Sequence, residues 1–130
     1  GNLGERGLVG PGGMIVFQDG APLLAGGSPS RSLSQCMLQN AVNILDFAMP
    51  IEESVNRPRY GSSIGDRGIT IEKDYDPGVR DAVGQRGIDF DVVNPWSLYH
   101  GSFDGVHFEP GTSTMTACGD PRRCSKAEGL

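Results

Sequence analysis

The sequence predicts an α+β protein in which helices pack on a mainly antiparallel sheet. Near its start, Asp19-Gly20 joins two short apolar runs, which is the typical signal of a β-hairpin. A long amphipathic helix is predicted next, because apolar residues recur there at three-and-four spacing. Several short segments of alternating apolar and polar residues follow, as in half-buried strands. Strands and helices in this order are typical of the α+β class.

The composition predicts one small domain with many loops. A chain of 130 residues is long enough to bury one hydrophobic core, and 20 glycines and 9 prolines lie scattered in turns without a fixed period. Residues 1–13 are rich in glycine and are predicted to form an extended loop or arm. The single α+β domain is therefore expected to span residues 14–130.

The charge pattern argues against several classes of function. A net charge of -5, with basic residues scattered among acidic ones, does not favour a nucleic-acid surface. No apolar run approaches the ~20 residues needed to cross a membrane, and residues 1–13 lack the pattern of a signal peptide. The glycine-rich segment Gly10-Pro11-Gly12-Gly13 lacks the Lys-Ser/Thr of a phosphate loop. We therefore predict a soluble chain with no cofactor.

The longest predicted helix begins at Ser32, which forms a capping box with Gln35. It is expected to continue to Pro50, since proline has no N–H to donate and disfavours helical geometry in the preceding residue. Cys36 falls near its apolar stripe and is expected to be a small buried residue. The hairpin before this helix is predicted to pair Met14–Gln18 with Ala21–Ala25.

The rest of the chain alternates between short helices and strands. A second helix is predicted for Ile51–Asn56, and a third for Asp76–Arg86 with Asp76 as N-cap, Val79 and Val83 on its buried face and Gly87 after its end. Residues beyond Asp120 are expected to form a polar tail. Gly61–Gly68 is predicted to be a polar loop, and the remaining strands are predicted at Ile69–Lys73, Ile88–Val92, Gly105–Glu109 and Ser113–Cys118.

Several of these pieces, in this order, resemble the small subunit of the gamma-glutamyltranspeptidases and related acylases. They are Gly27-Ser28-Pro29 before the long helix, the helix end Asn43-Ile44-Leu45-Asp46-Phe47-Ala48-Met49, Glu52-Glu53-Ser54-Val55, Arg57-Pro58-Arg59-Tyr60 and Gly119-Asp120-Pro121-Arg122. The resemblance covers nearly the whole chain. It implies part of the sandwich fold of the N-terminal nucleophile hydrolases, and the hydrolysis or transfer of gamma-glutamyl amides.

The resemblance also implies where the site lies. In this class the nucleophile is the amino-terminal Thr of the subunit, whereas residue 1 here is Gly, so the chain is expected to contain no catalytic residue of its own. Two serines that contact the substrate carboxylate in the family correspond to Val9 and Gly10. The oxyanion-hole turn corresponds to Gly27-Ser28-Pro29 followed by Ser30 and Arg31, where the family has paired glycines. Side chains at the last two positions are expected to crowd the turn.

Other reactive side chains are predicted to have structural roles. His100 and His107 stand in no recognisable nucleophile motif, so we expect them at the surface or packed on a sheet. Cys118 and Cys124 are compatible with a small disulfide loop and equally with free thiols. These two cysteines and a histidine lack the spacing of a zinc site, so no metal site is predicted. Glu52 and Glu53 are expected to be solvated.

Three hypotheses follow for the function. The chain is a gamma-glutamyltranspeptidase-like domain that is inactive when isolated, or it is one piece of an active enzyme that a separate upstream polypeptide completes. The third hypothesis is a non-enzymatic binding or assembly module. In that case the exposed edges and apolar face of its sheet are expected to drive the formation of homodimers or larger oligomers.

Overall fold

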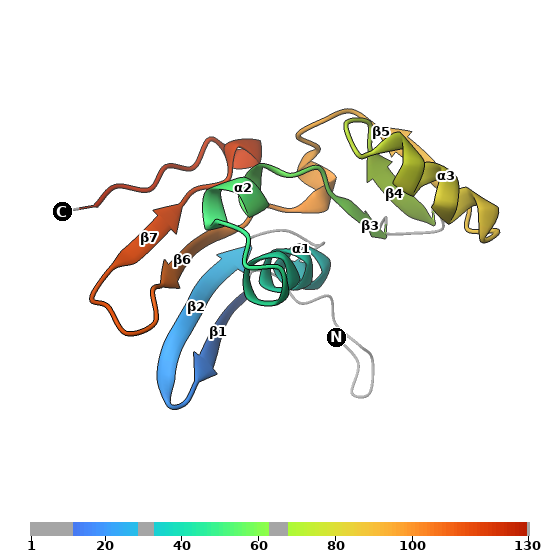
Figure 1. Ribbon diagram of the computed structural model, residues 1–130. Helices are drawn as coiled ribbons and strands as arrows, with labels where there is room; N and C mark the ends of the chain where they lie inside the picture. Colours follow the sequence, from blue (N-terminus) through green and yellow to red (C-terminus); the bar gives the residue numbers. More distant parts are fainter. Residues whose placement is uncertain (1–11, 29–32, 63–67, 130) are drawn as a thin grey trace, which may run out of the picture.

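The computed structural model describes residues 12–28, 33–62 and 68–129, and it contains two sheets connected by helices (Figure 1). The larger sheet has the strand order β1-β2-β6-β7, and the smaller has the order β3-β4-β5. Helices α1 and α2 lie between the two sheets along the chain and in space, while α3 lies beside the smaller sheet. The predicted α+β class is confirmed.

The larger sheet is antiparallel throughout. It consists of β1 (Gly12–Gln18), β2 (Ala21–Ser28), β6 (Asp104–Phe108) and β7 (Met115–Cys118). The predicted hairpin turn is present, with positive φ values of 51° at Asp19 and 82° at Gly20. The prediction that the arm extends to residue 13 is wrong, because β1 begins at Gly12 and pairs with the end of β2.

The smaller sheet combines antiparallel and parallel pairing. Strand β3 (Tyr60–Ser62) pairs antiparallel with β4 (Ile69–Glu72), which pairs in parallel with β5 (Phe90–Val93). Helix α3 (Pro77–Gln85) forms the crossover that a parallel pair requires. The expected loop at Gly61–Gly68 is therefore wrong at its start, because Tyr60–Ser62 finds hydrogen-bond partners in β4; residues 63–67 lie outside the described part.

The long helix is shorter than predicted. Helix α1 spans Leu33–Ala41, and a π-helical turn, η1 (Val42–Asp46), follows it. Ala48 then adopts a positive φ of 50°, which ends the helix before Pro50. The π-helical segment follows α1 directly, so the chain keeps coiling as far as Asp46 although the α-helix ends at Ala41. The helix-like spacing of apolar residues in the sequence therefore extends beyond the α-helix. Ser32 of the predicted capping box lies outside the described residues.

The two shorter helices begin and end close to the predicted positions. Helix α2 spans Ile51–Asn56, as predicted. The Asp76 carboxylate accepts hydrogen bonds from Gly78 N and Val79 N and so caps α3, and Gly87 follows with a φ of 74°. The predicted buried face of α3 is wrong: Val79 is 45% exposed, and no residue of this fully described helix is buried.

The hydrophobic core lies between the inner face of the larger sheet and helices α1 and α2. Phe103 is its largest member, and its ring lies over two glycines of adjacent strands, since a Cβ at Gly26 would be 2.4 Å from Phe103 Cζ and one at Gly105 would be 2.5 Å from Phe103 Cε1. Glycine is thus required at both positions. The buried members of the core are Leu24, Cys36, Ile44, Ile51, Val55 and Phe103.

The polar tail expected beyond Asp120 is wrong at its start, although residues 125–129 form no helix or strand. Two 3-10 turns, η2 (Leu98–His100) and η3 (Pro121–Arg123), flank the last two strands, and Asp120 and Arg122 are both buried. Their charges are compensated by residues far away in the sequence, which local composition cannot indicate. In the part of the chain that the structure describes, no helix is long and apolar enough to cross a membrane.

Candidate functional site

The end of β2 is the described part of the predicted oxyanion turn. Gly27 and Ser28 are its last two residues, and a Cβ at Gly27 would lie 2.9 Å from the carbonyl oxygen of Gly12 on β1. Glycine at position 27 therefore allows β1 and β2 to lie close together just before the predicted oxyanion turn. The other predicted site positions, Val9, Gly10, Pro29, Ser30 and Arg31, lie outside the described residues.

Helix α1, which begins after the turn, contacts β2. Ser28 at the end of β2 and Cys36 on α1 are both buried, and the Cys36 sulfur accepts a hydrogen bond from Arg59 Nη1 at 3.2 Å. Burial raises the pKa of the Cys36 thiol to about 11, although the Arg59 charge opposes that effect. The thiol therefore stays protonated at neutral pH, so Cys36 is unsuited to act as a nucleophile.

Arg59 belongs to a buried group of charges that joins the two sheets, which we call the junction and define as Arg59, Glu72, Asp120 and Arg122. Arg59 Nη1 lies 2.7 Å from Asp120 Oδ2, and Arg122 Nη2 lies 2.6 Å from Glu72 Oε2. Arg122 Nη1 also lies 3.4 Å from Asp120 Oδ1. Two positive and two negative side chains are thus buried together, and each charge has an opposite partner.

Backbone groups satisfy much of the remaining hydrogen-bonding capacity of the junction. Arg122 donates to the carbonyl oxygens of Val55 and Arg57 at 3.0 and 2.9 Å, and Asp120 Oδ2 accepts from Phe103 N at 2.8 Å. The Trp96 ring covers Arg122, with 5.0 Å between guanidinium carbon and ring centroid. Since Glu72 ends β4 and Asp120 follows β7, these bonds hold the two sheets against each other.

The charges around Glu72 determine its protonation state. Burial alone would raise the pKa of this carboxyl, but the neighbouring His100 imidazole and the Arg122 guanidinium lower it to about 2. Glu72 also accepts hydrogen bonds from Arg59 N at 2.9 Å and from Ser97 N at 2.8 Å. Glu72 is consequently ionised at neutral pH and has the role of a structural anion.

The histidines pack on the sheets, as predicted. His100 is buried, its Nε2 lies 2.8 Å from Thr70 Oγ1, and its Nδ1 lies 3.6 Å from Glu72 Oε1. This order of groups resembles a catalytic triad, but the Thr70 hydroxyl also lies within hydrogen-bonding distance of the Gly61 carbonyl, at 3.3 Å, and Glu72 is already paired with Arg122. His107 lies on β6, 3.7 Å from Glu109. We assign structural roles to both.

The other residues singled out in the sequence are two glutamates on α2 and two cysteines near the end of the chain. Glu52 and Glu53 are exposed on α2, as expected. Cys118 and Cys124 both carry free thiols, so of the two alternatives the structure has the reduced one. Among the described residues, no group of three His, Cys, Asp or Glu side chains is placed to hold a metal ion.

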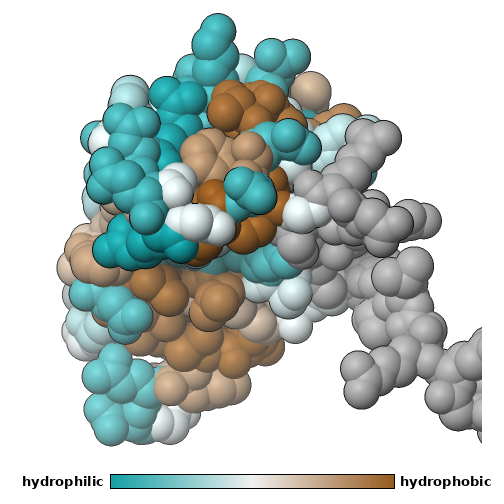
Figure 2. Space-filling model, turned by 90° about the vertical axis from the view of Figure 1, so that its right-hand side faces the viewer, coloured by the Kyte–Doolittle hydropathy of each residue, from teal (hydrophilic) through white to brown (hydrophobic). Residues whose placement is uncertain are grey.

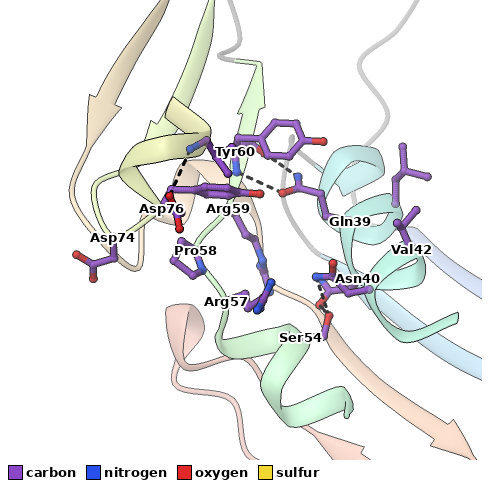
Figure 3. A pocket seen from close by; sticks show the side chains of 14 residues that line it. Gln39, Asn40, Val42, Ser54, Arg57, Pro58, Arg59, Tyr60, Asp74 and Asp76 are labelled. Atoms are coloured by element: carbon purple, nitrogen blue, oxygen red, sulfur yellow. Dashed lines mark hydrogen bonds between the residues drawn. The ribbon is translucent and has the colours of Figure 1, made fainter. Parts of the chain in front are cut away.

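A groove of about 680 Å³ lies between α1 and the start of α3, and sequence reasoning missed it (Figure 3). The Gln39 amide at its edge binds both backbone groups of Tyr60, with Nε2 2.7 Å from the carbonyl oxygen and Oε1 3.3 Å from the nitrogen. Asn40 and Asn43 hydrogen-bond the Ser54 hydroxyl within it. Its walls come from four segments of the chain, and no local sequence pattern indicates that these segments come together.

Residues 11–130 match the sequence profile of the family described as gamma-glutamyltranspeptidase. Among curated proteins, no sequence matches the chain. Solved structures are similar in fold. A gamma-glutamyltranspeptidase variant from Helicobacter pylori has a TM-score of 0.73 and 24% identity over 93% of this chain and 65% of its own.

Two other solved proteins extend this comparison. A gamma-glutamyltranspeptidase variant from Pseudomonas nitroreducens has a TM-score of 0.72 and 21% identity, covering 99% of this chain and 65% of its own. The transpeptidase CapD from Bacillus anthracis has a TM-score of 0.75 and 15% identity, covering 98% of this chain and 75% of its own. At such identities the likeness concerns the fold. The chain spans about 65% of the length of the first relatives.

Proposed function

Because the chain belongs to the gamma-glutamyltranspeptidase family, we propose that it forms part of an enzyme that hydrolyses or transfers gamma-glutamyl groups of amides. The observation that carries this proposal is the family match over residues 11–130, which includes the end of β2 and the junction. The fold similarity to solved gamma-glutamyltranspeptidases supports it.

The proposed roles of this chain are binding and electrostatic stabilisation. In the described residues, no Ser, Thr or Cys is paired with a free base in an accessible position, since Cys36 is a buried protonated thiol and the partner of Thr70 is His100, which is buried at the end of η2. We place the nucleophilic Thr in the part of the family fold that these residues do not span. Backbone N–H groups after Ser28 would then stabilise the charge that develops on the amide oxygen.

The test is hydrolysis of a chromogenic gamma-glutamyl anilide. A polypeptide of residues 1–130 is expected to release no product, whereas the complete protein, or the polypeptide mixed with an upstream segment that begins with Thr, is expected to turn over. An alanyl anilide serves as the control for general amidase activity. Turnover by residues 1–130 alone would contradict the placement of the nucleophile, and inactivity of the complete protein would contradict the proposed function.

A second proposal concerns assembly, and the surface of the larger sheet supports it. The face turned away from α1 carries a row of directly opposite apolar residues, Ile15, Ala25, Val106 and Ala117, with Phe108 and Met115 beside it; we call this the outer face. Ile15 is 61% exposed and Met115 is 64% exposed. Hydrophobic residues also gather near the hairpin in the lower part of Figure 2.

Such a face is expected to be covered by other protein. We propose that a further part of the enzyme covers it, and that a second copy of the chain takes its place when residues 1–130 are isolated. Mixing the isolated polypeptide with the upstream segment separates the two occupants, because the segment is expected to convert homodimers into a one-to-one complex. Sedimentation that shows only monomers, with and without the segment, would contradict the assembly proposal.

A further inference from the structure

The groove between α1 and the start of α3 has the size of a binding site for a small molecule. Its volume of about 680 Å³ falls within the usual range of such sites, roughly 300 to 1,000 Å³. Figure 3 shows α1 on one side of it and the start of α3 on the other, with residues 57–60 crossing between them. None of the roles assigned above uses this groove.

Hydrogen bonds between its walls fix the shape of the groove before any ligand binds. Gln39 on α1 holds both backbone groups of Tyr60 on β3, at 2.7 and 3.3 Å. The Ser54 hydroxyl on α2 donates to Asn40 Oδ1 at 2.9 Å and accepts from Asn43 Nδ2 at 3.2 Å. A ligand would therefore enter a preformed site, which lowers the cost of ordering on binding.

Opposite charges with unused capacity come from different segments around the groove. Arg57 is paired only loosely with Glu53, at 3.6 Å, and the two side chains are 54% and 55% exposed, so this ion pair is readily exchanged. The turn before α3 carries Asp74 and Asp76. Among the described residues Asp74 has no hydrogen bond or ion pair, and Asp76 uses only Oδ1 to cap α3. A ligand with one positive and one negative group would find both opposite charges here.

A buried donor in the floor of the groove also lacks a partner. Arg59 lines the groove, and Figure 3 shows its side chain between Pro58 and Asn40. This side chain is 2% exposed, and its Nη atoms bind Asp120 and backbone carbonyl oxygens, but its Nε has no partner in the described part of the chain. A buried N–H without an acceptor is unfavourable, so the floor favours an oxygen of a ligand beside Arg57.

Two tyrosines make an organic cation a better fit than a metal ion. The rings of Tyr60 and Tyr75 pack edge to face with 6.1 Å between their centroids, and both residues line the groove. Aromatic rings attract ammonium groups through their faces. The described residues place no three His, Cys, Asp or Glu side chains together to hold a metal ion.

We propose that the groove binds a zwitterion of the size of a free amino acid or a dipeptide. Its ammonium group would lie beside Asp76 and the two tyrosines, and its carboxylate beside Arg57 and Arg59. A purely anionic ligand would meet the aspartates, and a purely cationic one would meet the arginines. The inference goes beyond the proposed function and does not depend on it, because the test measures binding without turnover.

The test is calorimetric titration of the complete protein with L-alanyl-L-alanine. The dipeptide is expected to bind at least about tenfold more tightly than its N-acetyl derivative, which lacks the ammonium group, and than its amide, which lacks the carboxylate. L-alanine shows whether the shorter zwitterion suffices. By NMR, the dipeptide is expected to shift the amide signals of Gln39, Tyr60 and Tyr75, and not those of Gly26 and Gly27.

Charge-removing variants identify which wall binds which group. Asp76→Asn keeps an oxygen that caps α3, so the helix is preserved. It is expected to weaken dipeptide binding about tenfold and to leave binding of the N-acetyl derivative unchanged, because that probe lacks the group that Asp76 contacts. Arg57→Gln is expected to do the same for the dipeptide and its amide. Asp91→Asn, at an exposed position of β5 outside the groove, is the matched control and is expected to bind like wild type.

Three results would overturn the inference. They are no binding of either zwitterion at millimolar concentrations, equal binding of the dipeptide and its two derivatives, and NMR shifts that lie outside the groove. Turnover of gamma-glutamyl anilides by a complete protein that binds no zwitterion would contradict the inference and leave the proposed function intact. An inactive complete protein that binds the dipeptide in the groove would do the reverse.

Discussion

The junction and the outer face of the larger sheet differ in whether their side chains have partners within this chain. The junction buries four charged residues, yet each has an opposite charge within 3.4 Å. The outer face exposes large apolar residues, with Ile15 61% and Met115 64% accessible. The comparison indicates that the charges between the two sheets are paired within this chain, whereas the exposed apolar residues of the outer face are the basis of the assembly proposal.

The largest effect is expected from breaking the junction with Arg122→Ala. Glu72 would then lose its buried guanidinium partner, and Asp120 would keep only Arg59, so the free energy of unfolding is expected to fall by about 3 to 5 kcal/mol. Urea denaturation measures this change. Arg123→Ala is the matched control, because the adjacent Arg123 is exposed, and it is expected to change stability by less than about 0.5 kcal/mol. Equal effects of the two variants would remove the basis of the comparison.

Acid is expected to weaken the junction without any mutation. The pKa of Glu72 is lowered from 4.5 to about 2, so its contribution is present above pH 4.5 and is lost as the pH falls toward 2. The lost stability is on the order of 2 kcal/mol. Urea denaturation from pH 6 to pH 2 measures how the free energy of unfolding depends on pH and so checks this loss.

The variant Glu72→Gln supplies the reference for the acid titration. It is expected to be less stable than wild type at pH 6, and its stability is expected to change less between pH 4.5 and 2, because residue 72 no longer takes up a proton. The exposed Glu109→Gln is the matched control and is expected to keep the wild-type slope. An unchanged slope in Glu72→Gln would show that other carboxyl groups cause the acid sensitivity.

Glycine-to-alanine and alanine-to-valine substitutions compare the two faces of the larger sheet. Gly26→Ala places a Cβ 2.4 Å from Phe103 Cζ on the inner face, so it is expected to cost about 1 to 3 kcal/mol in thermal or urea unfolding. Ala117→Val adds volume on the outer face, where Ala117 is exposed, and is expected to change stability by less than about 0.5 kcal/mol. A larger loss for Ala117→Val than for Gly26→Ala would reverse the assignment of the faces.

Elements with strong local signals could be predicted from the sequence. Asp19-Gly20 specified the hairpin, Pro50 preceded a helix that begins at Ile51, and Asp76 capped α3. These signals depend on the backbone preferences of a few adjacent residues. The position of β3 could not be predicted, because a three-residue strand depends on its partner β4 more than on its own composition.

Burial of charged residues was also beyond sequence reasoning. Arg122 follows a turn near the end of the chain, where charged residues are usually solvated, and its burial depends on Glu72, which lies 50 residues earlier. Similarly, Val79 has the spacing of a buried helical residue but lines an open groove. Of the candidate site, Gly27 and Ser28 lie in the described structure. The hydrogen bond between Arg59 and Cys36 had no sequence signal apart from the Arg57-Pro58-Arg59-Tyr60 segment itself.

Sedimentation velocity of a polypeptide of residues 1–130 tests most directly whether the outer face needs a covering partner. Over a range of concentrations, the wild-type polypeptide is expected to associate, whereas Ile15→Lys/Met115→Lys stays monomeric and its unfolding midpoint shifts little, because both residues are already exposed. Leu98→Lys, which changes an exposed residue outside this face, is expected to associate like wild type. A wild-type polypeptide that remains monomeric at the highest concentration, or a double variant that associates equally well, would contradict the account.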